Sequence, residues 1–147
     1  MKRKLICVIA VAVLLSAAVL GMLHLNTSDR GHFNVLQANW DVTIPKQAGC
    51  QIIYQNDQRG GFHGDGLSYY VYTCENGGAM DGLFDWQTTQ TPHADCETWL
   101  DALGVPDDVR PPYTKCGMKC MTKSGGDELL LWWDSVNRLL YVVESYM

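Results

Sequence analysis

The segment Asp57–Gly66 contains the candidate side chains for acid–base catalysis and for ion binding. Its sequence is DQRGGFHGDG, and its glycines allow backbone conformations that other residues resist. His63 followed by Asp65 could form an oriented general base, as a small hydrolase would need. Asp57 and Asp65 could instead contact a cation, and the clustered backbone amides could contact an anion. The segment is therefore the first candidate for a functional site.

Each of these functions lacks part of its usual sequence context. No G-x-S-x-G or comparable nucleophile motif accompanies His63 and Asp65. The acidic residues do not follow EF-hand spacing, and no Lys or Ser/Thr follows the glycines as in a phosphate loop. A structural alternative is a long hairpin loop in which Phe62 packs under a sheet and His63 or Asp65 bonds to backbone. We therefore assign no catalytic residue and keep Phe62, His63 and Asp65 as candidates for a binding site.

The cysteines allow several disulfide arrangements. Of the six, Cys7 lies in an apolar N-terminal stretch, and the other five are Cys50, Cys74, Cys96, Cys116 and Cys120. Two disulfides and one free thiol are possible in an oxidising compartment, so the connectivity stays open. Across a straight strand the Cα atoms of Cys116 and Cys120 would be about 13 Å apart, and only a turn would let them bridge. His63 and His93 are isolated, so we expect no metal site, and no motif indicates a cofactor.

The start of the chain predicts a membrane anchor or a signal peptide. Three basic residues at 2–4 precede an uncharged apolar stretch at 5–23, which as a helix would be roughly 28 Å long, close to the thickness of a bilayer core. The basic residues place 1–4 in the cytoplasm and everything after 23 outside. Cleavage sites with small residues are poor, which favours an anchor. We expect a single-pass cell-membrane protein with its N-terminus inside, or a secreted protein if the leader is cleaved.

The remainder is the size of one acidic domain. Residues 24–39 are polar without a clear period and predict a tether, and residues 40–147 predict an extracytoplasmic domain. The leader holds three of the 11 Lys and Arg residues, so eight remain against 16 acidic residues, a net charge of −8. Nucleic acid and anionic lipid headgroups are therefore not expected partners.

Hydrophobic periodicity predicts an α+β fold. Residues 91–104 carry the strongest helix signal, with Thr91 as cap, Pro92 at the first position and an apolar face that includes Cys96 and Trp99. A shorter helix is possible over 80–87. Strands are expected over 42–44, 51–55, 67–74 and 115–122, and in a hairpin formed by 129–133 and 139–143. We predict an antiparallel sheet of about five strands with one packed helix, preceded by the transmembrane or signal helix.

Three segments carry a resemblance to a known group of proteins. These are Ile44–Cys50, the GGFHGDG of residues 60–66 leading into a Tyr-rich strand, and the closing hairpin over 129–144. Together they resemble small uncharacterised membrane-anchored or secreted proteins of Firmicutes. The resemblance implies a short N-terminal membrane segment and a small α+β domain, and it supplies no catalytic residues.

The leading functional hypothesis is a membrane-anchored extracytoplasmic binding or interaction module. It rests on the leader, on the absence of a catalytic motif, and on aromatic residues in excess of what one core face can hold, namely Tyr69, Tyr70, Tyr72, Trp132 and Trp133. Its partners would be the membrane, through the N-terminal helix, and a protein or small molecule outside the cell. The alternative is a small extracytoplasmic hydrolase using His63 and Asp65. Thiol chemistry at Cys116 and Cys120 is a third, weaker hypothesis.

Overall fold

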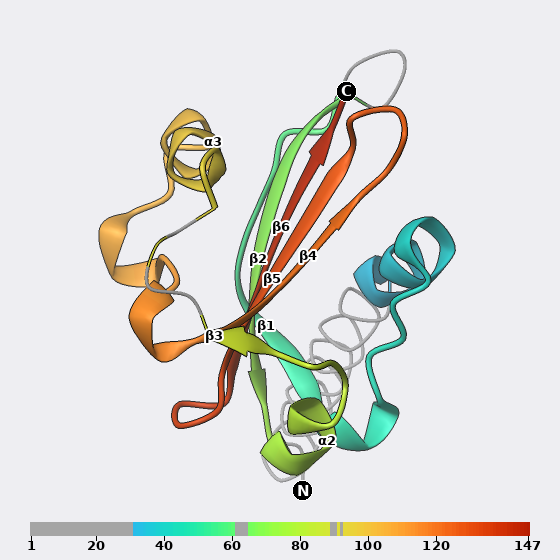
Figure 1. Ribbon diagram of the computed structural model, residues 1–147, viewed down its shortest axis with the longest axis vertical. Helices are drawn as coiled ribbons and strands as arrows, with labels where there is room; N and C mark the ends of the chain where they lie inside the picture. Colours follow the sequence, from blue (N-terminus) through green and yellow to red (C-terminus); the bar gives the residue numbers. More distant parts are fainter. Residues whose placement is uncertain (1–30, 61–64, 89–90, 92) are drawn as a thin grey trace, which may run out of the picture.

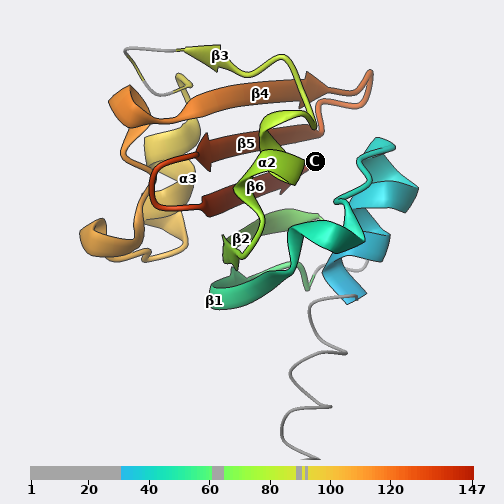
Figure 2. The same ribbon diagram turned by 90° about the horizontal axis from the view of Figure 1, so that it is seen from below.

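The computed structural model describes residues 31–60, 65–88, 91 and 93–147, which form an α+β domain. Six antiparallel strands make one sheet in the order β1-β2-β6-β5-β4-β3 (Figure 2). The strands are β1 (Cys50–Asp57), β2 (Gly66–Cys74), β3 (Gln87–Thr88), β4 (Gly117–Thr122), β5 (Glu128–Asp134) and β6 (Leu139–Tyr146). The α+β class and the antiparallel sheet are confirmed. The extra strand is the two-residue β3, and the expected strand over 42–44 is irregular chain instead.

The sheet is built around β2, β6 and β5, which are buried almost from end to end. Their aromatic and branched side chains suit a pleated surface that is covered on both faces. β2 and β6 pair over eight residues, with Tyr70 opposite Val142 and Tyr72 opposite Leu140. The large side chains that alternate between the two faces of the strand predicted at 67–74 are therefore buried on both faces of the sheet. The two N-terminal strands and the three C-terminal strands meet along this β2–β6 pair.

Helix α3 (Cys96–Ala102) covers one face of the sheet. Cys96 and Leu100 are fully buried against it and Trp99 is half-buried, as the apolar spacing predicts. The helix is shorter than 91–104: it begins after Asp95, and Gly104 follows its end with a φ of +66°. Pro92 lies outside the described residues. The other short helices are α2 (Gly77–Asp81), in place of the helix expected at 80–87, and the 3-10 turns η1 (Lys46–Ala48), η2 (Asp107–Val109) and η3 (Tyr113–Lys115).

A second long helical segment, residues 31–40, lies on the opposite side of the sheet from α3 (Figure 1). His32, Leu36 and Trp40 are buried at helical spacing of four residues and join a core with β2, β5 and β6. Residues 31–39, part of the expected tether, are therefore helical and packed, and the sheet has a helix on each of its two faces. The helical pattern of apolar residues is hard to see in the sequence, because of the three inward-facing residues His32 is polar and Trp40 is amphipathic. Within the described residues, no helix has the length and apolar character needed to cross a bilayer.

One disulfide joins the first residue of β1 to the last residue of β2. Cys50 and Cys74 lie directly opposite each other in the β1–β2 register. Cys96, Cys116 and Cys120 are free thiols, so the C-x3-C pair on and beside β4 does not form a bridge. The disulfide cross-links two strands that already pair, and it fixes the end of the hairpin opposite the glycine-rich loop.

Candidate functional site

β1 and β2 form an antiparallel pair, and the described residues of the glycine-rich segment lie at the end where this pair is connected. Gly66 has a φ of +139°, and a Cβ atom there would lie 2.8 Å from the carbonyl oxygen of Gln58, so the chain needs glycine at this position. Asp65 is exposed, and within the described residues it makes no hydrogen bond or ion pair. Phe62 and His63 lie outside the described residues. The hydrolase with His63 and Asp65 therefore stays a prediction.

Asp57, at the end of β1, forms an ion pair with Arg59. Arg59 donates to Asp57 Oδ1 from its backbone N at 3.0 Å and from Nε at 2.9 Å, and its Nη2 contacts Oδ2. The Tyr70 hydroxyl also donates to Oδ2, at 2.7 Å. These hydrogen bonds, with those from Arg59 foremost, hold the pKa of Asp57 well below its usual range. Asp57 therefore does not act with Asp65 as a free cation ligand, and no metal-binding cluster occurs among the residues described.

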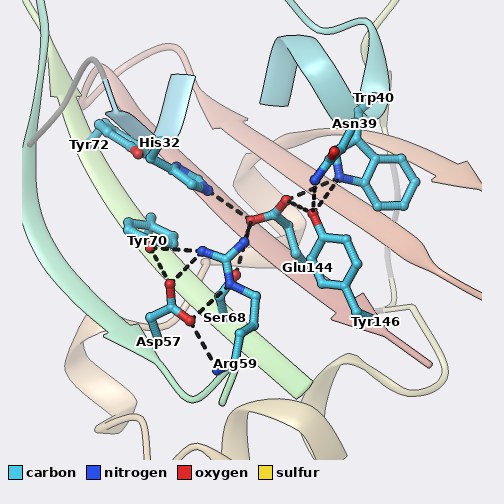
Figure 3. A network of polar contacts seen from close by, with 10 residues as sticks. All are labelled: His32, Asn39, Trp40, Asp57, Arg59, Ser68, Tyr70, Tyr72, Glu144 and Tyr146. Atoms are coloured by element: carbon cyan, nitrogen blue, oxygen red, sulfur yellow. Dashed lines mark hydrogen bonds and ion pairs between the residues drawn. The ribbon is translucent and has the colours of Figure 1, made fainter. Parts of the chain in front are cut away.

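A fully buried carboxylate, Glu144 of β6, lies at the centre of a polar network between the sheet and the helix over 31–40 (Figure 3). Its Oε1 accepts hydrogen bonds from Trp40 Nε1 at 3.0 Å and from the Tyr146 hydroxyl at 2.6 Å. Its Oε2 contacts His32 Nε2 at 2.8 Å and Ser68 Oγ at 3.0 Å. Ser68 lies directly opposite Glu144 in the β2–β6 register, which explains why these two side chains meet.

Arg59 connects this carboxylate to the glycine-rich loop. Its Nη1 lies 3.4 Å from Glu144 Oε2, while its remaining nitrogens contact Asp57 and the Tyr70 hydroxyl. The guanidinium thus bridges two carboxylates, one on β1 and one on β6, across the intervening strand β2. The network joins the helix over 31–40, both central strands and the base of the loop.

The geometry makes Glu144 a structural anchor. A carboxylate offers about four acceptor positions, and five groups surround this one, so no acceptor position remains for a substrate. Burial alone would raise its pKa, but the hydrogen bonds led by the one from His32 outweigh burial and lower it. Glu144 therefore stays ionised and fixes the helix over 31–40 to the sheet.

His32 extends the network to a buried tyrosine. Its Nδ1 contacts the Tyr72 hydroxyl, and its ring stacks on Tyr70 with 3.6 Å between ring centroids. A Glu–His–Tyr series of this kind resembles a proton relay, but His32 is only 5% exposed and Tyr72 is fully buried. A substrate would reach it only if the helix moved, so the series holds the helix in place. No sequence motif identifies His32 or Glu144. Each is a polar residue at a position where the pattern of its helix or strand calls for an apolar one.

A cavity of about 750 Å³ opens against the same helix, which contributes Phe33, Asn34 and Gln37 to its lining. It lies between the helix over 31–40 and the chain that leads into β1, and Glu75 beyond β2 completes its wall. Its polar lining is dominated by carboxamide side chains: Asn34, Gln37, Gln47 and Gln51. Phe33, Ile44 and Pro45 supply apolar surface, and Lys46 and Glu75 supply opposite charges. Because its walls come from three separate segments, no local sequence pattern predicts it.

The free cysteines do not form a reactive site. Burial raises the pKa of Cys96 to about 12 and that of Cys116 to about 12, and it also raises the pKa of Cys120. Thiolate, the reactive form, is therefore scarce at neutral pH. All three contribute to the apolar core under α3, which argues against thiol chemistry there.

The excess of aromatic residues also has a structural explanation. The five residues that suggest a ligand-binding surface are all buried: Tyr69, Tyr70, Tyr72, Trp132 and Trp133. They divide between the two cores, one on each face of the sheet. One core face could not hold them, but two can, so they give no evidence for a surface site.

Comparisons with known proteins found no matching family model, no matching curated protein and no matching solved structure. The resemblance to Firmicutes proteins therefore stays a prediction. The cavity and the Glu144 network are therefore the features of this chain that bear on its function.

Proposed function

We propose that this chain is a membrane-associated extracytoplasmic binding module whose ligand site is the cavity beside the helix over 31–40. The single observation that carries the proposal is the cavity itself. Its volume of about 750 Å³ lies within the range of small-molecule sites. Its mixed lining of apolar surface and several carboxamides is typical of sites that orient a polar ligand.

The Glu144 network supports this function by making the cavity wall rigid. His32 and Trp40 attach the helix to the sheet, while Phe33 and Gln37 on a neighbouring side of the same helix line the cavity. A preformed wall reduces the ordering cost of binding. The disulfide acts similarly at the other wall, because Cys50 also lines the cavity. A disulfide is also typical of proteins in oxidising compartments, which supports a position outside the cytoplasm.

A ligand screen on the full chain tests the proposal. Amino acids, short peptides, saccharides and nucleosides are added to the detergent-solubilised protein, and binding is read from thermal stabilisation and from a titration. The blocking variant is Gln37→Trp, which fills the cavity. The matched control is Ala38→Trp, which places the same side chain at the next position of the helix, an exposed residue that does not line the cavity.

We expect at least one compound to bind the unmodified chain and Ala38→Trp but not Gln37→Trp. Equal binding by all three would place the site elsewhere, and binding by none would refute the proposal. The location has a separate test: protease added to intact spheroplasts should digest residues 31–147, and full protection would contradict the orientation.

A further inference from the structure

We infer that the ligand of this cavity is a short peptide with free ends; this inference rests on the proposed function and names its ligand class. The first argument is the carboxamide lining. Asn34, Gln37, Gln47 and Gln51 each present one carbonyl acceptor and two N–H donors. A peptide bond presents the complementary pair, one donor and one acceptor. Four carboxamides around one cavity therefore match a ligand that repeats the amide group.

The second argument is the pair of opposite charges in the lining. Lys46 and Glu75 are both exposed, and neither has an ion-pair partner among the described residues. Arg59 and Arg110 differ from them, because both guanidinium groups are paired with carboxylates of the fold. An unprotected peptide carries an α-carboxylate that suits Lys46 and an α-ammonium that suits Glu75. A neutral saccharide would leave both charges without a partner.

The third argument is the position of the cavity at the edge of the sheet. β1 is the outermost strand, with only β2 beside it in the described sheet, and its first residues, Cys50 and Gln51, line the cavity. Extended peptides add to exposed sheet edges through main-chain hydrogen bonds. A cavity of this volume admits a ligand of about two to four residues. The edge strand and the cavity thus favour an extended backbone over a compact ring.

The test is a titration of the full chain with three probes: trialanine, N-acetyl-trialanine and trialanine amide. We expect trialanine to bind most tightly, and each blocked form to bind about tenfold more weakly at low salt. Lys46→Met should weaken trialanine binding by a similar factor and leave the already weakened amide unchanged. Glu75→Gln should likewise weaken trialanine binding and leave the already weakened binding of N-acetyl-trialanine unchanged. Such a cycle isolates each pairwise interaction.

Two substitutions serve as matched controls outside the cavity. Lys115→Met in η3 and Asp108→Asn in η2 remove exposed charges of the same sign and should leave all three affinities unchanged. Added salt should reduce the difference between free and blocked probes, because rim charges are screened.

The failure of this inference can be distinguished from failure of the proposed function. If trialanine does not bind while a saccharide or nucleoside does so in a Gln37→Trp-sensitive way, the ligand class is wrong and the binding site stands. If free and blocked peptides bind equally, or if Lys46→Met weakens both forms alike, the role of the charges is refuted. If no compound binds, both fall.

Discussion

Glu144→Gln tests most directly whether the Glu144 carboxylate anchors the helix over 31–40 to the sheet. The change keeps the shape of the side chain but removes its charge and replaces one acceptor oxygen by an NH2 group. The neighbouring groups suit a carboxylate: Trp40 and Tyr146 donate to Oε1, and His32, Ser68 and Arg59 face Oε2. In either orientation, the amide NH2 group must face hydrogen-bond donors.

The expected loss of unfolding free energy is about 3–5 kcal/mol. Hydrogen bonds to a charged group contribute about 1.5–3 kcal/mol each, and removing one partner of a buried ionic network costs about 3–5 kcal/mol. Arg59, which lies 3.4 Å away, would lose one of its two carboxylate partners. Since a domain of this size is stable by about 5–15 kcal/mol, the loss should be large but measurable.

Urea unfolding of the full chain, followed by tryptophan fluorescence, measures this loss. The matched control is Glu128→Gln on the neighbouring strand, where the ion-pair partner of the partly buried carboxylate among the described residues is His93, at 3.8 Å. It should cost less than about 1 kcal/mol. A Glu144→Gln loss no larger than that of the control would refute the anchor role.

The pH dependence of the same variant provides a second readout. The folded pKa of Glu144 lies below its ordinary value of 4.5, so the stability from its ionised form is complete above that value and is lost as the pH falls below it. Asp57, whose pKa is also lowered, acts in the same direction. The difference in stability between the unmodified chain and Glu144→Gln should therefore be full at about pH 6 and shrink below about pH 4. A difference that did not change with pH would mean that the charge of Glu144 is not what stabilises the fold.

Three further substitutions or treatments address other parts of the fold. Gly66→Ala should destabilise the domain by about 1–3 kcal/mol because its φ of +139° and the nearby Gln58 carbonyl exclude a Cβ, whereas Gly60→Ala, with open space around it, should be nearly neutral in the same urea assay. Trp99→Ala should cost about 2–4 kcal/mol, somewhat less than for a fully buried tryptophan, and a melting temperature equal to that of the unmodified chain would mean that α3 is packed differently. Reducing the Cys50–Cys74 disulfide should lower stability by about 3 kcal/mol, because it closes a loop with a sequence separation of 24; an unchanged urea midpoint in dithiothreitol would contradict this.

Several elements could be recognised in the sequence because their signals are local. Alternating and continuous apolar runs indicate β2, β5 and β6, and the spacing of Cys96, Trp99 and Leu100 indicates α3. Each of these patterns reflects the period of one strand or one helix, so neighbouring residues are enough to show it. The helix over 31–40 was not predicted from the sequence because its inward-facing residues include a histidine. A histidine counts as polar in a hydrophobic pattern, and its buried partner Glu144 is distant in the sequence.

The α+β class, the main strands and α3 follow from the sequence, because the periods of strands and helices depend on residues close together in the chain. The order of the strands, the disulfide partner of Cys50 and the groups around Glu144 depend on the tertiary structure. His32 and Glu144 are 112 positions apart in the chain, and they meet because β2 and β6 pair and the helix packs across them. The cavity has the same origin, since its walls come from the helix over 31–40, from residues 43–51 and from Glu75. Such contacts depend on the sum of packing over the whole fold, so a local pattern can supply the residues but cannot assign their partners.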